Sequence, residues 1–334
     1  MQIKSLVVAL TAALAAAISF NASAQAPIVI KFSHVVATDT PKGQAAERFK
    51  ELAEKATKGR VKVEVYPNSQ LYKDKEELEA LQLGAVQMLA PSLAKFGPLG
   101  VKEFEAFDLP YIFPTKAALY SVTEGPIGKS LLQKLEPKGI TGLAYWDNGF
   151  KVMSANKQLR VPADFRGQKL RIQSSKVLDA QMRALGANPQ VLAFSEVYQA
   201  LQTGVVDGTE NPPSNMYTQK MHEVQKHVTL SNHGYLGYAV IVNKKFWDGL
   251  PADIRTSLTT AMRDATTFEK AIAQRDNDLA LEAIKKTGKT AIYTPTAAEQ
   301  AEWRKVLLPV HKQMESRIGA ELIGSINKTA AAVK

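Results

Sequence analysis

Two cations, Arg171 and Lys151, stand apart from the mixed charged runs of this sequence. Arg171 lies between two apolar residues in a predicted strand, 169–172, so its own side chain must point to the opposite face of that strand. A guanidinium group at a strand end can hold a carboxylate through two parallel charge-assisted hydrogen bonds. Lys151 follows an aromatic-rich segment, 145–150, which we interpret as a turn. From the residues alone, Arg171 is either an anion-binding arginine or an ordinary structural arginine of a strand.

Asn211 is a third candidate for binding a ligand. It lies in Glu210-Asn211-Pro212-Pro213 and follows an apolar pair and Gly208, an order that predicts the abrupt end of a strand. Pro212 favours an extended conformation for Asn211, which leaves the side-chain amide free to donate to a ligand. A simple turn asparagine is the other interpretation.

The sequence lacks the common motifs of catalysis and metal binding. It contains no Gly-x-Ser-x-Gly elbow, no complete phosphate-binding loop, no Gly-x-Gly-x-x-Gly and no cysteine. His222 and His227 are five positions apart, one more than a zinc-binding helix needs, so their rings would point to different faces. We therefore expect a protein that is not an enzyme, needs no cofactor and binds no metal.

The first residues have the order of a secretory signal. Lys4 precedes an apolar run, 6–20, and the small residues 22–24 follow it. This order predicts cleavage after Ala24, and the run is shorter than the roughly 20 apolar residues that span a bilayer. Because the chain has no cysteine that could carry a lipid anchor, we expect the mature protein in the periplasm.

The net charge of +10 does not indicate a nucleic-acid partner. Positive and negative residues alternate, as in the runs 73–77 and 275–278, and alternating signs are typical of a solvated surface. We therefore expect no binding to nucleic acid.

The mature chain of about 310 residues is long enough for two lobes. Two similar successions of elements support this division. The first consists of a strand at 28–34, a helix from Pro41 to Ala56, a strand at 61–65, a helix at 75–83 and a strand at 86–90. The second consists of a strand at 169–172, a helix at 175–185, a strand near Val191, a helix at 195–203 and a strand at 206–207.

Such alternation predicts parallel α/β lobes whose ligand cleft lies beyond the carboxyl ends of the strands. The helical pattern of 251–287 fits either one long helix that crosses both lobes or two helices joined near 275–278.

The sequence resembles the extracytoplasmic solute-binding proteins of tripartite ATP-independent periplasmic (TRAP) transporters, and it looks most like their dicarboxylate-binding branch. The resemblance covers essentially the whole mature chain. It implies a two-lobe periplasmic binding protein fold, two crossover connections and a single long helix spanning both lobes. It also implies a small organic acid anion as ligand, lobe closure without ATP and integral membrane transporter subunits as partners. The segments that carry the resemblance are 66–71, 167–172, 193–208 and 210–212.

The same resemblance implies roles for individual residues. Arg171 falls on the family's carboxylate-binding arginine, Asn211 on its cleft asparagine and Lys151 on the position of a second cation. Phe194 matches an aromatic residue that packs against the ligand. The first-lobe residues that would face the ligand are Ser33, His34, Ser92 and Lys95.

The expected ligand is a C4-dicarboxylate. Sugar-acid binders of this family resemble one another in an asparagine near position 35 and an acidic residue near position 92, whereas this chain has Val35 and Ser92. The alternatives are a 2-oxo acid, lactate, an aromatic acid or a sugar acid.

We expect a monomer with domain I at 25–148 and 237–276 and domain II at 149–236 and 277–334. A ligand-sensing accessory to a sensor kinase would have the same binding chemistry. A secreted α/β hydrolase or isomerase is the remaining alternative, although the sequence shows no assembled nucleophile and base.

Overall fold

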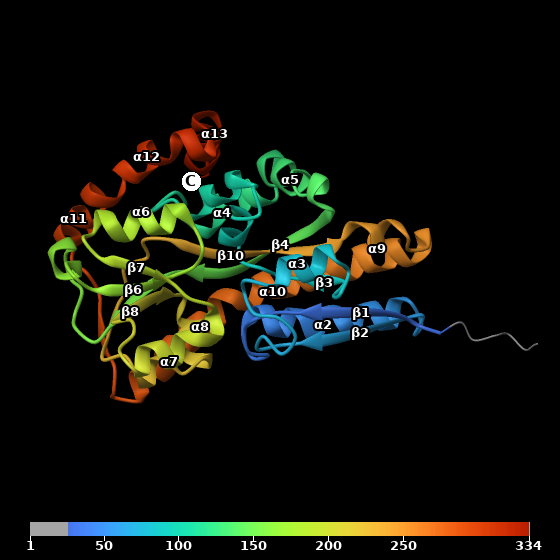
Figure 1. Cartoon of the computed structure of the whole chain (residues 1–334), viewed down its shortest axis with the longest axis horizontal. Coiled ribbons are helices and arrows are strands. Elements are labelled where there is room, and N and C mark those ends of the chain that lie inside the picture. Colours follow the sequence, from blue (N-terminus) through green and yellow to red (C-terminus); the bar gives the residue numbers. More distant parts are fainter. Residues whose placement is uncertain (1–25, 334) are drawn as a thin grey trace, which may run out of the picture.

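Two β-sheets lie side by side in the computed structural model, which describes residues 26–333 (Figure 1). One sheet has five strands in the order β2-β1-β3-β10-β4, and the other has six in the order β11-β9-β5-β8-β6-β7 within the described residues. We call the part of the chain around the five-stranded sheet lobe I and the part around the six-stranded sheet lobe II. Helices cover the sheets, which confirms the predicted two-lobe α/β fold.

The strands of lobe I are β1 (Ile28–Ser33), β2 (Val61–Tyr66), β3 (Met88–Leu89), β4 (Ile140–Phe150) and β10 (Tyr235–Asn243). The strands of lobe II are β5 (Val152–Ala155), β6 (Lys169–Ile172), β7 (Asn188–Val191), β8 (Gly208–Asn211), β9 (His227–Thr229) and β11 (Ala291–Tyr293). The α-helices are α2 (Pro41–Ala56), α3 (Glu77–Gln82), α4 (Lys116–Thr123), α5 (Pro126–Gln133), α6 (Lys176–Ala184), α7 (Val197–Gln202), α8 (Pro213–Thr218), α9 (Lys244–Asp248), α10 (Ala252–Lys286), α11 (Ala297–Leu307), α12 (Pro309–Ile318) and α13 (Ala320–Ala331). Short 3₁₀ helices are η2 (Leu93–Phe96), η3 (Lys102–Asp108), η4 (Glu136–Lys138), η5 (Pro162–Phe165), η6 (Phe194–Glu196) and η7 (Met221–Glu223).

Parallel strands in each lobe bring their carboxyl ends to one edge of the sheet. In lobe I, β1 runs parallel to β2 and β3, and in lobe II, β6 runs parallel to β7 and β8. The loop after β2, the segment after β3 and the end of β6 therefore lie where a ligand cleft is expected.

Two local predictions from the sequence are wrong. Residues 145–150, predicted as a turn, form the second half of β4, which pairs with β10. The strand predicted at 206–207 begins instead at Gly208, so Glu210 and Asn211 lie within a strand and not after it. Their buried polar side chains hid this strand, because the apolar pattern that marks strands in a sequence is missing there.

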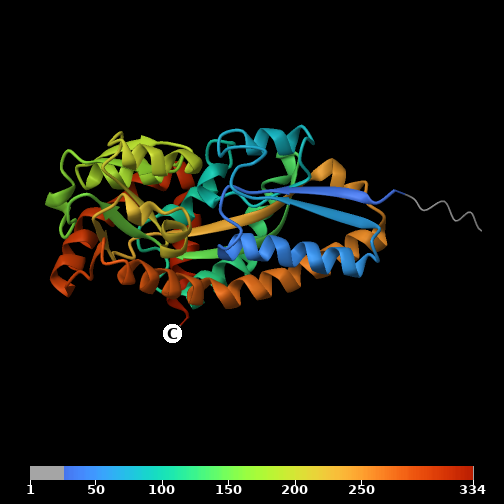
Figure 2. The ribbon, with the colours of Figure 1, turned by 90° about the horizontal axis from the view of Figure 1, so that it is seen from below.

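Helix α10 is continuous over 35 residues, which decides for one long helix and against two joined helices. At 1.5 Å per residue it extends over about 50 Å. Figure 2 shows it running beneath both lobes. Ile254 and Ala265 pack with Phe32 in lobe I, whereas Ile284 packs with Val228 in lobe II. The chain also crosses between the lobes from β4 to β5 and from β9 to β10, which are the two expected crossovers.

The C-terminal helices return to lobe I. Val310 of α12 and Ile323 of α13 belong to the same apolar cluster as Phe104 and Phe107, whereas Trp303 of α11 packs on lobe II. The predicted domain boundaries stay a prediction, and this packing favours placing 309–331 with lobe I. No helix in the described part of the chain is both long and apolar enough to cross a membrane. The predicted signal, 1–24, lies outside the described residues.

Candidate functional site

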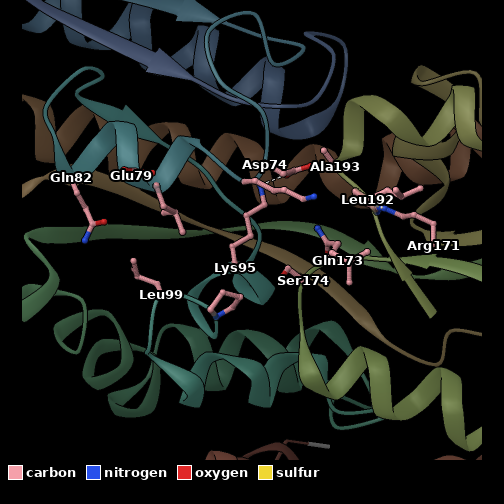
Figure 3. A pocket seen from close by; sticks show the side chains of 14 residues that line it. Asp74, Glu79, Gln82, Lys95, Leu99, Arg171, Gln173, Ser174, Leu192 and Ala193 are labelled. Atoms are coloured by element: carbon pink, nitrogen blue, oxygen red, sulfur yellow. Dashed lines mark hydrogen bonds and ion pairs between the residues drawn. The ribbon is translucent and has the colours of Figure 1, made fainter. Parts of the chain in front are cut away.

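A cavity of about 280 Å³ lies between the lobes and brings charged side chains from both of them together (Figure 3). Lobe I contributes Asp74 and Lys95, and lobe II contributes Arg171 and Gln173. The volume is close to the lower end of the roughly 300–1,000 Å³ typical of small-molecule pockets, so it suits a small ligand. The remaining lining residues are Lys75, Leu78, Glu79, Gln82, Pro98, Leu99, Ser174, Val191, Leu192 and Ala193.

Arg171 lies in β6 with only 2% of its surface exposed, although it lines the cavity. Its Nε and Nη2 donate to the carbonyl oxygen of Leu192 at 3.1 and 2.9 Å. The guanidinium carbon lies 5.8 Å from the centroid of the Phe194 ring. Burial lowers the pKa of Arg171, but an arginine stays protonated in proteins. The guanidinium is thus a fixed, desolvated positive charge with donors left for a ligand.

Lys95 is the buried cation among the two lysines, Lys75 and Lys95, with which lobe I lines the cavity. Its Nζ forms ion pairs with Glu77, at 2.5 Å, and with Asp74. Burial opposes the charge of Lys95, but the two carboxylates raise the pKa of this lysine, so it is protonated. Burial also raises the pKa of Glu77 despite the nearby Lys95. Lys95 therefore shares its charge with one ionised carboxylate and with one that takes up a proton more readily.

Asp74 joins the two lobes. Its carboxylate forms an ion pair with Lys95 of lobe I and accepts a hydrogen bond from the backbone N–H of Phe194 of lobe II. Burial opposes ionisation, but Lys95 and Arg171 lower the pKa of Asp74 to about 2. The interpretation of 73–77 as a solvated run is therefore wrong for Asp74 and Glu77, whose side chains are only 11% and 1% exposed.

Lys151 is not among the residues that line the cavity. Its Nζ bonds Glu210 Oε1 at 2.7 Å, and both side chains are buried. The other oxygen of Glu210 contacts His233 Nε2 at 2.8 Å, and His233 Nδ1 contacts the hydroxyl of Ser231 at 2.7 Å. Burial opposes ionisation of Glu210, yet Lys151 and His233 lower the pKa of this carboxyl to about 2. The structure thus gives Lys151 a protein partner, and its contact with a ligand stays a prediction.

Three lobe I residues predicted to face a ligand are not among the residues that line the cavity. Ser33 and His34 are fully buried at the end of β1, and within the described residues neither the Ser33 hydroxyl nor a His34 ring nitrogen has a partner. Burial, reinforced by the charge of Lys42, lowers the pKa of His34 to about 3, so its ring is neutral. Ser92 accepts a hydrogen bond from Gln173 Nε2 at 2.8 Å, which links the lobes.

The last two predicted residues come from lobe II. Asn211 is 5% exposed and donates to Thr209 Oγ1 at 3.4 Å. Phe194 is buried in an apolar cluster below Arg171. Of all the predicted site residues, Arg171 and Lys95 line the cavity, and the ligand contacts of the others stay predictions.

Sequence reasoning missed Asp74 and Gln173. Asp74 lies in a charged run that reads as surface, yet it follows β2, a strand of the parallel set whose carboxyl ends face the cleft. Gln173 is the first residue beyond β6. The strand-end rule would have found Gln173, whereas Asp74 lies in the loop eight residues beyond the end of β2 and carries no such signal.

Known proteins are similar to this chain over nearly its whole length. A family model described as "Bacterial extracellular solute-binding protein, family 7" matches residues 32–317. The C4-dicarboxylate-binding periplasmic protein DctP of Rhodobacter capsulatus is 69% identical over 319 residues, which cover 96% of each chain.

Solved structures agree with these matches. A TRAP periplasmic solute-binding protein from Sulfurospirillum deleyianum with bound succinate is 47% identical with a TM-score of 0.89, and the match covers 93% of this chain and 100% of that one. A counterpart from Pseudomonas aeruginosa with bound L-malate is 44% identical with a TM-score of 0.84, covering 86% of this chain and 100% of that one. By its fold, its cleft and these relatives, the chain belongs to family 7 of the bacterial extracellular solute-binding proteins.

Proposed function

We propose that this protein is the solute-binding subunit of a TRAP transporter and binds a C4-dicarboxylate such as succinate, fumarate or malate. The observation that carries this proposal is that two buried cations from different lobes, Arg171 of lobe II and Lys95 of lobe I, line one small cavity. The relatives named above, two of them with succinate or L-malate bound, support it independently. One carboxylate would bind Arg171, and the other would bind Lys95.

The charge balance of the cleft explains how a dianion can be accommodated. Asp74 and Glu77 already neutralise part of the positive charge of Lys95. Less of that charge is therefore available to a carboxylate of the ligand. Because burial raises the pKa of Glu77, this carboxyl can take up a proton when the ligand enters. Lys95 would then turn from Glu77 to the ligand carboxylate.

Lobe closure follows from the same charges. Removing an anion or a cation from water without a partner of opposite charge costs much free energy. When the lobes close around the ligand, its carboxylates and the buried cations become partners, so both are stabilised. The contacts of Asp74 with Phe194 and of Ser92 with Gln173 require the lobes to be together. Ligand would therefore select the closed form by its greater affinity for that form, and membrane subunits would recognise the closed form.

Thermal melting of the mature protein should reveal the ligand class. We expect succinate, fumarate or malate to stabilise the protein more than lactate or a neutral sugar, because only a dianion uses both cations. A ligand whose concentration is about a hundred times its dissociation constant adds about 2.7 kcal/mol to the free energy of unfolding. Small-angle scattering of the same samples should show compaction on adding succinate. Stabilisation by monocarboxylates or sugar acids alone would refute the dicarboxylate assignment and leave the family assignment standing.

We also propose that the protein is exported and matured by cleavage after Ala24. The small residues 22–24 after an apolar run support this, as does the extracellular character of the family. Protein released by osmotic shock should begin at Gln25 in N-terminal sequencing. Recovery of the chain in the cytoplasmic fraction with Met1 intact would contradict export.

A further inference from the structure

Two buried carboxyl groups, Glu269 and Asp147, meet away from the cavity where α10 crosses β4. Glu269 lies near the middle of the 35-residue helix and is fully buried. Asp147 lies near the end of β4, shortly before the chain crosses to lobe II at Lys151. Both elements are therefore joined at a point close to where they leave lobe I.

The contacts of this pair leave one oxygen of each carboxyl group without a partner. The backbone N–H of Asp147 donates to Glu269 Oε2 at 2.9 Å. Lys116 Nζ and the hydroxyl of Tyr120, both from α4, donate to Asp147 Oδ2 at 2.8 Å each. Within residues 26–333, Glu269 Oε1 and Asp147 Oδ1 are buried and accept no hydrogen bond. A buried polar atom without a partner is costly, and two of them in neighbouring carboxyl groups call for a common explanation.

The surrounding charges do not balance two carboxylates. Among the residues that the structure describes, Lys116 is the one cation that forms an ion pair with either carboxyl group, and its partner is Asp147. Lys270 of α10 also faces this region, but its Nζ pairs with Glu124 and lies 4.7 Å from the centroid of the Tyr120 ring.

Two tyrosines of β10 also face the pair: the hydroxyl of Tyr235 lies close enough to interact with the Asp147 carboxyl, and Tyr238 lies near Glu269. Both are neutral because burial raises their pKa above the usual value. Burial, reinforced by the charge of Asp147, also raises the pKa of Glu269 well above its usual value. One proton held between the two carboxyl groups would balance Lys116 and satisfy both free oxygens.

We propose that Glu269 and Asp147 share one proton at neutral pH, with Glu269 Oε1 donating to Asp147 Oδ1, and that this clasp holds the middle of α10 on β4. Loss of the proton at alkaline pH would place two negative charges together in a buried site and loosen α10 from β4. Because α10 spans both lobes, the clasp is a pH-sensitive restraint on the helix that must adapt when the lobes move. This inference does not depend on which anion the cavity binds.

The pH dependence has a definite sign. The pKa of Glu269 is raised in the folded protein above its ordinary value of 4.5. The folded state therefore binds this proton more tightly than the unfolded state does, so the stability it contributes is complete below about pH 4.5. That contribution falls as the pH rises towards and through the raised pKa.

Glu269→Gln tests the clasp, because the amide oxygen of glutamine can accept from the Asp147 N–H and its NH₂ group can donate to Asp147 Oδ1 at every pH. Melting temperatures of ligand-free variant and wild type should therefore diverge as the pH rises, with the variant gaining about 2–4 °C relative to the wild type between pH 6 and pH 9. Glu124→Gln is the matched control, because it removes an exposed carboxylate next to the same site, and its difference from the wild type should change little with pH. A Glu269→Gln protein that is destabilised equally at all these pH values would overturn the proposal.

Infrared spectroscopy of the wild type is a second test of the shared proton, and it does not require any variant to fold with native stability. A protonated carboxyl group should give its C=O stretching band at pH 7, and the band should disappear at strongly alkaline pH. In Glu269→Gln the band should lose the intensity of one carboxyl group, and the intensity that remains should come from other buried carboxyls such as Asp108, whose pKa burial raises to about 7. Absence of a protonated carboxyl band from the wild type at pH 7 would also overturn the proposal.

Discussion

Replacement of Arg171 with methionine should weaken succinate binding about ten-fold to a hundred-fold or more. The reason is that charged hydrogen bonds contribute about 1.5–3 kcal/mol each, and 1.4 kcal/mol corresponds to a factor of ten in affinity. Arg171→Lys should also lose affinity clearly, because lysine retains the charge but lacks the planar fork of donors. Isothermal titration calorimetry of the folded proteins measures both effects.

The structure adds an effect on stability that the sequence could not reveal. Since Nε and Nη2 of Arg171 hold the Leu192 carbonyl, either substitution should also lower the melting temperature of the ligand-free protein. Arg183→Met is the matched control, because Arg183 is an exposed arginine on α6 paired with Asp179, and it should bind succinate normally. An Arg171→Met protein of reduced stability that nevertheless binds with wild-type affinity would make Arg171 purely structural.

Replacement of Lys151 with methionine should destabilise the fold by about 3–5 kcal/mol, because it leaves Glu210 as a buried carboxylate without its ammonium partner. His233 contacts only the other oxygen of Glu210 and therefore compensates only in part. Removing both charges in Lys151→Met/Glu210→Gln should cost less than the two single changes added together, because the partners are coupled. Urea unfolding of the three variants measures these free energies.

The same variants decide what Lys151 does. If the ion pair with Glu210 is its main role, Lys151→Met loses stability, and affinity measured on the folded protein at low temperature falls much less than in Arg171→Met. Wild-type stability combined with lost affinity would instead assign this lysine to the ligand, as the resemblance implies.

Much of the fold is predictable from the sequence because the signals are local. The side chain of Thr40 accepts from the Gly43 N–H at 3.1 Å and Pro41 starts α2, as the capping pattern predicts. The alternation in 61–65 predicts β2, and the apolar spacing of 251–287 predicts α10. Whether α10 was one helix or two could not be decided locally, because its two halves pack on different lobes.

The site was less predictable, because its residues differ only in burial from residues of the same type that have a similar sequence context elsewhere. Asp74 has the same sequence context as a surface aspartate, and only the folded chain shows it buried between Lys95 and Phe194. Lys151 has the same context as a ligand-binding cation, and only the folded chain shows Glu210 beside it. Residue types indicated the charge of the site, and tertiary packing decided which charges reach the cavity.

The central claim is that Arg171 and Lys95 bind the two carboxylates of one ligand. Calorimetric titration of the wild type with succinate and with its monoamide, succinamate, tests it most directly, since the two ligands have nearly the same size and differ in one charge. Succinate should bind at least about ten-fold tighter than succinamate, because the amide cannot accept a charged hydrogen bond of the same strength. Equal affinity for the two ligands would contradict it.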